Sequence, residues 1–114
     1  MLTGNRDTAF TIWESAAQKY NDDHYILFEA AERFNKHGFS EKAILLYEQS
    51  YEKAPKPKEL DSVYARAFLY TNLGRKSEAI SMWNLIIKSL SDDYGIVNGE
   101  CVDWAKREIA NLSL

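Results

Sequence analysis

The chain has 114 residues, of which 46% are hydrophobic and 13% aromatic, so its composition favours one folded domain with a core over disorder. Its 17 acidic and 14 basic residues give a formal net charge of −3, which does not favour a nucleic-acid or anionic-membrane surface. The single cysteine, Cys101, excludes an intrachain disulfide and a cysteine zinc cluster. Because the sequence shows no signal-peptide pattern and no apolar run near the roughly 20 residues of a membrane span, we expect a cytoplasmic protein without membrane contact.

Helical periodicity runs through the whole sequence. Apolar residues recur at gaps of three and four, the spacing of an amphipathic helix, and no long stretch alternates with the period of a strand. In chain order, the pattern predicts six helices, at 7–20, 24–37, 40–53, 58–72, 76–90 and 97–112. Asp22 and Asp23 offer N-caps for the second helix, Gly38 and Gly74 stand where left-handed residues end helices, and Pro57 marks another break. The sequence therefore predicts an all-α protein whose neighbouring helices pack as antiparallel hairpins.

Two short patterns repeat along this helical chain. The first is a Gly, then an Ala five residues later, then an aromatic four residues after that. Its three copies are 34 and 36 residues apart and consist of Gly4, Ala9 and Trp13, of Gly38, Ala43 and Tyr47, and of Gly74, Ala79 and Trp83. The second is a small residue followed three positions later by an aromatic, at Ala31/Phe34, Ala67/Tyr70 and Cys101/Trp104. Because such two-helix units cannot bury their apolar faces alone, we expect them to stack.

A two-helix unit with a period near 34 resembles the tetratricopeptide repeat. The first-helix positions of that repeat are occupied here by Leu27, Ala30, Ala31 and Phe34, by Val63, Arg66, Ala67 and Tyr70, and by Val97, Glu100, Cys101 and Trp104. The resemblance implies a right-handed α-solenoid of stacked antiparallel hairpins in a single domain, 1–114. Its parts would be a half repeat at 1–23, repeats at 24–59 and 60–93, and a half repeat or capping helix at 94–114. Because this scheme begins in mid-repeat, we expect a fragment of a longer array, with a naturally short protein as the alternative.

The resemblance also implies a binding surface, because the first helices of this family line a concave face. The positions that correspond to that face are Tyr25, Phe28, Glu32 and Asn35, then Asp61, Tyr64, Phe68 and Asn72, then Asn98, Val102 and Lys106. Aromatic anchors within a polar rim are typical of peptide recognition. The alternative is that these aromatics pack on one another or on a missing repeat.

One subset of the family holds the C-terminal carboxylates of chaperones with Lys, Asn and Arg side chains. The corresponding residues here are Phe28, Glu32, Asp61 and Ala65, none of which can hold a carboxylate. We therefore expect a protein or peptide partner with apolar residues and positive charge instead of a chaperone tail. The alternative is self-association, as a homodimer or a longer array, through the terminal half repeats.

The search for catalytic or metal-binding residues finds no converging set. His24 and His37 are 13 residues apart and cannot share a metal at helical spacing. Cys101 occupies a small-residue position and is expected to be buried, while Asp92 and Asp93 are expected to cap a helix. The glycines are too scattered to form a phosphate-binding loop. We therefore expect a protein that is not an enzyme and uses no cofactor or metal.

Overall fold

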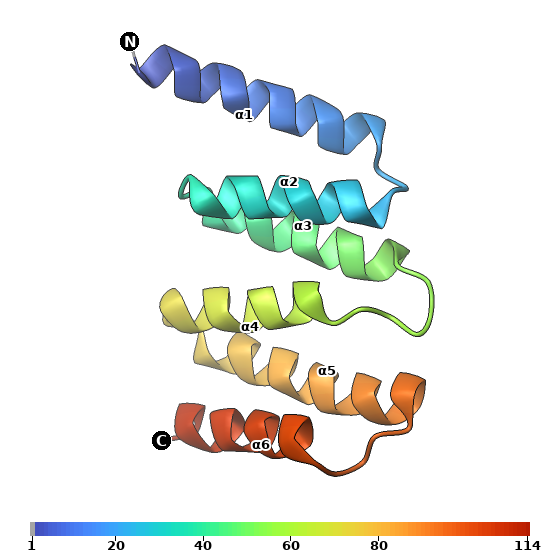
Figure 1. Cartoon of the computed structure of the whole chain (residues 1–114). Coiled ribbons are helices and arrows are strands. Elements are labelled where there is room, and N and C mark those ends of the chain that lie inside the picture. Colours follow the sequence, from blue (N-terminus) through green and yellow to red (C-terminus); the bar gives the residue numbers. More distant parts are fainter. Residues whose placement is uncertain (1) are drawn as a thin grey trace. The chain divides into compact units, whose positions relative to one another are not determined.

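The computed structural model describes the backbone from residue 2 to residue 114 and the side chains from residue 11 onward. This part of the chain contains six α-helices and no strand, which confirms the all-α prediction (Figure 1). The helices are α1 (Leu2–Lys19), α2 (His24–Lys36), α3 (Ser40–Lys53), α4 (Asp61–Asn72), α5 (Lys76–Tyr94) and α6 (Glu100–Leu112). Within the described residues, no helix combines the length and the apolar character needed to cross a membrane. Ala9, the alanine of the first copy of the Gly, Ala, aromatic pattern, lies outside the residues whose side chains are described.

The chain divides into two compact units, which are described separately. The first ends at Ala54 and contains α1, α2 and α3, and the second spans Pro55–Leu114 and contains α4, α5 and α6. Within each unit, consecutive helices run antiparallel (Figure 1). The predicted hairpins are therefore present inside both units.

The helix ends follow the local signals in the sequence. The Asp23 carboxylate accepts hydrogen bonds from the backbone N–H groups of Tyr25, at 3.0 Å, and Ile26, at 3.3 Å, and so caps α2. Gly38 and Gly74 adopt φ angles of 86° and 76° in the turns after α2 and α4. These three predictions are confirmed.

In the first unit, small residues let α2 and α3 pack closely. Ala31 and Ala43 are fully buried, and so are the larger residues beside them, which are Leu27, Phe34 and Tyr47. The Ser50 hydroxyl donates a hydrogen bond to the His24 carbonyl at 2.7 Å, so that the end of α3 is tied to the start of α2. On the other side of α2, the Trp13 ring of α1 meets the edge of Phe34 at a centroid distance of 5.5 Å.

In the second unit, α4 repeats the buried stripe of α2. Its buried residues at the matching positions are Val63, Arg66, Ala67 and Tyr70, and the core of α5 is formed by Ala79, Trp83, Ile86 and Leu90. The segment before α4 contacts the end of α5, because the Lys58 N–H donates to the Asp93 carboxylate at 3.2 Å and Tyr94 donates to the Lys58 carbonyl at 2.8 Å. Asp93 therefore lies in the last turn of α5 and caps no following helix, which corrects the expectation for the Asp92–Asp93 pair.

The predicted register of the third first-helix copy, which begins at Val97, is wrong. α5 continues to Tyr94, where Gly95 ends it with a φ of 66°, and α6 begins only at Glu100. Val97 therefore precedes the helix and is 69% exposed. The buried residues of α6 are Val102 and Ala105, and Cys101 is exposed. The predicted interior position of Cys101 is therefore wrong, and Val102 and Ala105 form the buried face of α6 instead.

Candidate functional site

Four aromatic side chains of the second unit form one aromatic cluster. Tyr64 and Phe68 come from α4, Trp83 from α5 and Trp104 from α6. Trp104 stacks on Tyr64 with centroids 5.3 Å apart and planes inclined by 16°, and it lies 6.1 Å from Phe68. Trp83 meets the edges of Tyr64, Phe68 and Trp104 at 5.7, 5.6 and 5.1 Å. Each ring thus contacts at least two others, so the four side chains form one continuous cluster.

The cluster has a buried base and an exposed outer side. Trp83 is 1% exposed, whereas Phe68 is 46% exposed and Tyr64 and Trp104 are partly exposed. The Trp83 indole N–H finds no hydrogen-bond acceptor among the described residues, in keeping with surroundings made of aromatic rings. Burial raises the pKa of Tyr64 above its ordinary value, and the nearby Cys101 raises it further.

Charged residues surround Trp104 at the edge of this cluster. An open hollow of about 440 Å³ is lined by Glu100, Cys101, Asp103, Trp104 and Arg107. Asp61, in the first turn of α4, precedes Tyr64 by three residues, and neighbours at this spacing lie on the same face of a helix. The aromatic surface therefore borders on carboxylates from two helices.

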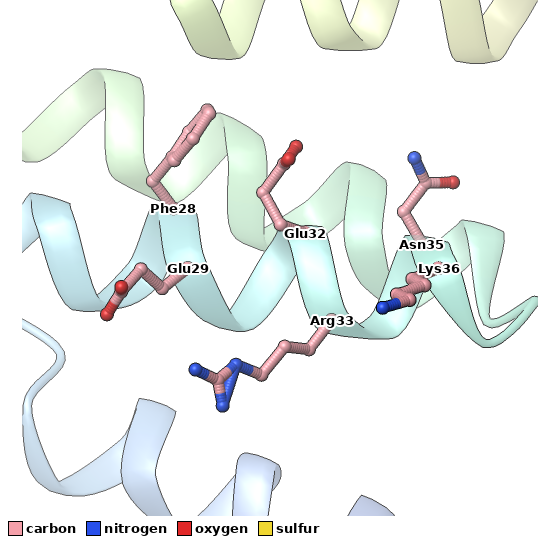
Figure 2. Close-up of a pocket in the computed structure, with 6 residues that line it drawn as sticks. All are labelled: Phe28, Glu29, Glu32, Arg33, Asn35 and Lys36. Atoms are coloured by element: carbon pink, nitrogen blue, oxygen red, sulfur yellow. The ribbon is translucent and has the colours of Figure 1, made fainter.

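A second surface lies on α2 in the first unit. Its open hollow, of about 520 Å³, is lined by Phe28, Glu29, Glu32, Arg33, Asn35 and Lys36. Figure 2 shows Phe28, Glu32 and Asn35 projecting from one side of the helix, and Glu29 and Arg33 from the other. Phe28 meets the edge of Tyr47, from α3, at a centroid distance of 5.5 Å.

The Glu32 carboxylate is held by a buried tyrosine. The Tyr47 hydroxyl donates a hydrogen bond to Glu32 Oε2. The pKa of Tyr47 is raised above its ordinary value, first because burial disfavours the phenolate and then because of the hydrogen bond and negative charge of Glu32. Glu32 therefore stabilises the α2–α3 pair, a role that sequence reasoning did not assign to it.

A smaller hollow between α1 and α2 was not predicted. It measures about 120 Å³ and is lined by Trp13, Ala16, Ile26, Glu29, Ala30 and Arg33. The repeat pattern marked Trp13 as a packing residue, and its ring does contact Phe34. The open space beside that ring depends on the distance between the two helices, for which the sequence carries no signal.

The structure distributes the predicted partner-binding residues over both units. Phe28, Glu32 and Asn35 line the α2 hollow, and Tyr64 and Phe68 belong to the aromatic cluster. Tyr25 is exposed and lies beside His24, with ring centroids 4.0 Å apart, while Asp61 and Asn72 are exposed at the two ends of α4.

The structure contradicts the prediction for one of these residues, Val102. It is only 2% exposed, so its side chain offers no surface to a partner. Trp104, which the sequence analysis did not assign to the binding face, stacks on Tyr64 and is partly exposed. The signal that was missed is Gly99, whose φ of 120° places the start of α6 at Glu100 and not at Val97.

No protein-family model matches the chain, and no curated protein matches it. Among the residues with described side chains, no group of three or more His, Cys, Asp and Glu is placed to hold a metal ion.

Proposed function

We propose that the chain is a non-enzymatic, tetratricopeptide-like interaction module that binds a peptide or a helix of another protein. The observation that carries the proposal is the aromatic cluster, in which Phe68, Tyr64 and Trp104 share an exposed surface above the buried Trp83. A solenoid of stacked hairpins with a concave binding face is part of this proposal.

The cluster has the properties of a binding anchor. Aromatic residues dominate the energetic centres of protein interfaces because they bury a large area and lose little conformational entropy. Phe68 is held from two sides by Trp83 and Trp104, so little further ordering is needed when a partner binds. A Phe that remains 46% exposed at such a place leaves apolar surface for a partner to cover.

The matching stripes of α2 and α4 support the repeat architecture. Residues at the same four positions of the pattern are buried in both helices, with Leu27, Ala30, Ala31 and Phe34 in the first unit and Val63, Arg66, Ala67 and Tyr70 in the second. The second-helix residues Ala43 and Tyr47, and their counterparts Ala79 and Trp83, are buried as well. Equal spacing and equal burial in two copies are what stacked two-helix repeats require.

Cys101 provides a direct test of the proposal. It is the only cysteine, it is exposed, and it lies beside Trp104 at the edge of the cluster. A photo-reactive maleimide attached there should cross-link a partner protein when the labelled chain is irradiated in cell extract. The same label on a Phe68→Ala variant should give no such product.

A matched control places the label elsewhere. Ser15, exposed on α1, can carry the only cysteine in a Cys101→Ser, Ser15→Cys variant. The proposal predicts a product from Cys101 that Ser15→Cys does not give. Equal products from the Phe68→Ala variant, with circular dichroism showing it folded, would contradict a role for the cluster.

Self-association is the second candidate function. Ile12 on α1 and Val97 before α6 are 60% and 69% exposed, so both leave apolar surface that a second copy of the chain can cover. Light scattering over a range of protein concentrations tests this candidate. A dimer that Ile12→Asp or Val97→Asp dissociates would support it, and a monomer at the highest concentration would exclude it.

A further inference from the structure

We infer that the segment that binds the aromatic cluster is basic, with an Arg or Lys beside an apolar anchor. The inference rests on the function proposed above and adds the chemical class of the partner. It is carried by the charges that surround the aromatic rings, which are mostly carboxylates.

The carboxylates come from both helices that flank the cluster. Glu100 and Asp103 line the hollow that contains Trp104, and Arg107 is the base among its lining residues. On α4, Asp61 precedes Tyr64 by three residues, and on α6, Glu108 follows Trp104 by four, so both lie on the faces that carry these rings. Four carboxylates thus lie near the cluster, against two bases of α6, Arg107 in the hollow and the exposed Lys106.

This combination favours a cation for two physical reasons. Exposed carboxylates create a negative potential that attracts and orients a positively charged segment. The faces of Trp104 and Tyr64 carry negative quadrupole charge, so a guanidinium or ammonium group gains a further attraction when it lies over them. Phe68, 46% exposed in the same cluster, offers contact area for the apolar anchor. An acidic segment would meet repulsion at the same place.

Selection from random peptides tests the inference directly, because the surface itself then chooses the chemistry of its ligand. Dodecapeptides displayed on phage are selected on the immobilised chain and counter-selected on the Phe68→Ala variant. We expect the peptides that depend on Phe68 to carry an excess of Arg and Lys over Asp and Glu, next to aromatic or aliphatic residues. Their affinity should fall as salt shortens the Debye length from about 10 Å at 0.1 M to about 3 Å at 1 M.

Isosteric neutralisation then tests the carboxylates one at a time. Glu100→Gln and Asp61→Asn should each weaken a selected peptide about 1.5- to 5-fold, the range measured for exposed ion pairs. Glu29→Gln is the matched control, because Glu29 projects from the side of α2 opposite Phe28 and should leave the affinity unchanged (Figure 2).

The possible results of the peptide selection distinguish failure of the basic-partner inference from failure of the proposed function. Neutral or acidic peptides that still depend on Phe68 would overturn the inference and leave the proposed function standing. If no peptide depends on Phe68, both fail. If light scattering shows a dimer that Phe68→Ala converts to a monomer, the occupant is a second copy of the chain, and the inference of a basic partner segment is wrong.

Discussion

Truncation of Phe68 should weaken partner binding strongly while the protein remains folded. Complete burial of a Phe side chain stabilises a protein by about 1.5–3 kcal/mol. Phe68 is 46% exposed, so only about half of that, roughly 1–1.5 kcal/mol, is lost in Phe68→Ala. The two lost ring contacts, with Trp83 and Trp104, contribute about 0.5 kcal/mol each at this partly exposed site. The total expected loss of stability is therefore about 2 kcal/mol.

A loss of this size leaves the protein folded. Typical stabilities of about 0.05–0.15 kcal/mol per residue correspond to roughly 6–17 kcal/mol for a chain of 114 residues. The free energy of unfolding can be measured by urea denaturation with circular dichroism. Binding can be measured by fluorescence anisotropy of a labelled peptide selected on the wild-type chain alone, without counter-selection on Phe68→Ala. We expect Phe68→Ala to retain its helix content while peptide affinity falls at least tenfold, because central aromatic anchors contribute about 2 kcal/mol or more to binding.

Leu45→Ala is the control for Phe68→Ala. Leu45 is an apolar residue on α3 that is 45% exposed, so its truncation removes a side chain of similar exposure outside the cluster. It should destabilise the protein by about 1–2 kcal/mol and leave the peptide affinity unchanged. A loss above about 4 kcal/mol for Phe68→Ala would mean that Phe68 is a core residue, and unchanged affinity would mean that the cluster is not the site.

Three further predictions concern the framework of the two units. Trp83→Ala should destabilise the protein by about 3–5 kcal/mol, measured by urea denaturation, because it removes the buried base of the cluster. Asp23→Ala should cost about 0.5–2 kcal/mol in the same assay, since two N–H groups of α2 lose their acceptor. The pKa of Tyr47 is raised in the folded state, so its contribution to stability is complete below the ordinary pKa of about 10 and is lost as pH rises above it. Urea midpoints should therefore fall from about pH 9 to about pH 11 in the wild type and fall less in Tyr47→Phe.

Each of these three has a result that would contradict it. A loss of stability below about 1 kcal/mol for Trp83→Ala would show that Trp83 is not the buried packing residue of the cluster. Asp22→Ala is the control for the cap: its side chain is exposed and pairs with Lys53 at 3.2 Å, so a loss equal to that of Asp23→Ala would refute the cap. For the pH series, an equal fall in Tyr47→Phe would assign the alkaline loss to other groups.

Local chemistry was enough to predict the helices and several of their ends. Asp23 caps α2 with its own carboxylate, and Gly38 and Gly74 adopt the left-handed conformation expected at helix ends. The buried stripes of α2 and α4 were also predictable, because each follows from the spacing of apolar residues within one helix. All of these features depend on residues within a few positions of one another.

The make-up of the candidate site was decided by tertiary packing. The packing of α6 against α5 and α4 buries Val102 and brings Trp104 onto Tyr64. Sequence spacing placed Val102 on the binding face and Cys101 inside, because it carried the register of the earlier copies past Gly95 and Gly99. The sequence by itself determined that the chain forms helices and about where they lie, although the bounds of α1, α4, α5 and α6 differ by several residues from the predicted ones. Contacts between α4, α5 and α6, which join residues far apart in the chain, determined which aromatic side chains reach the surface.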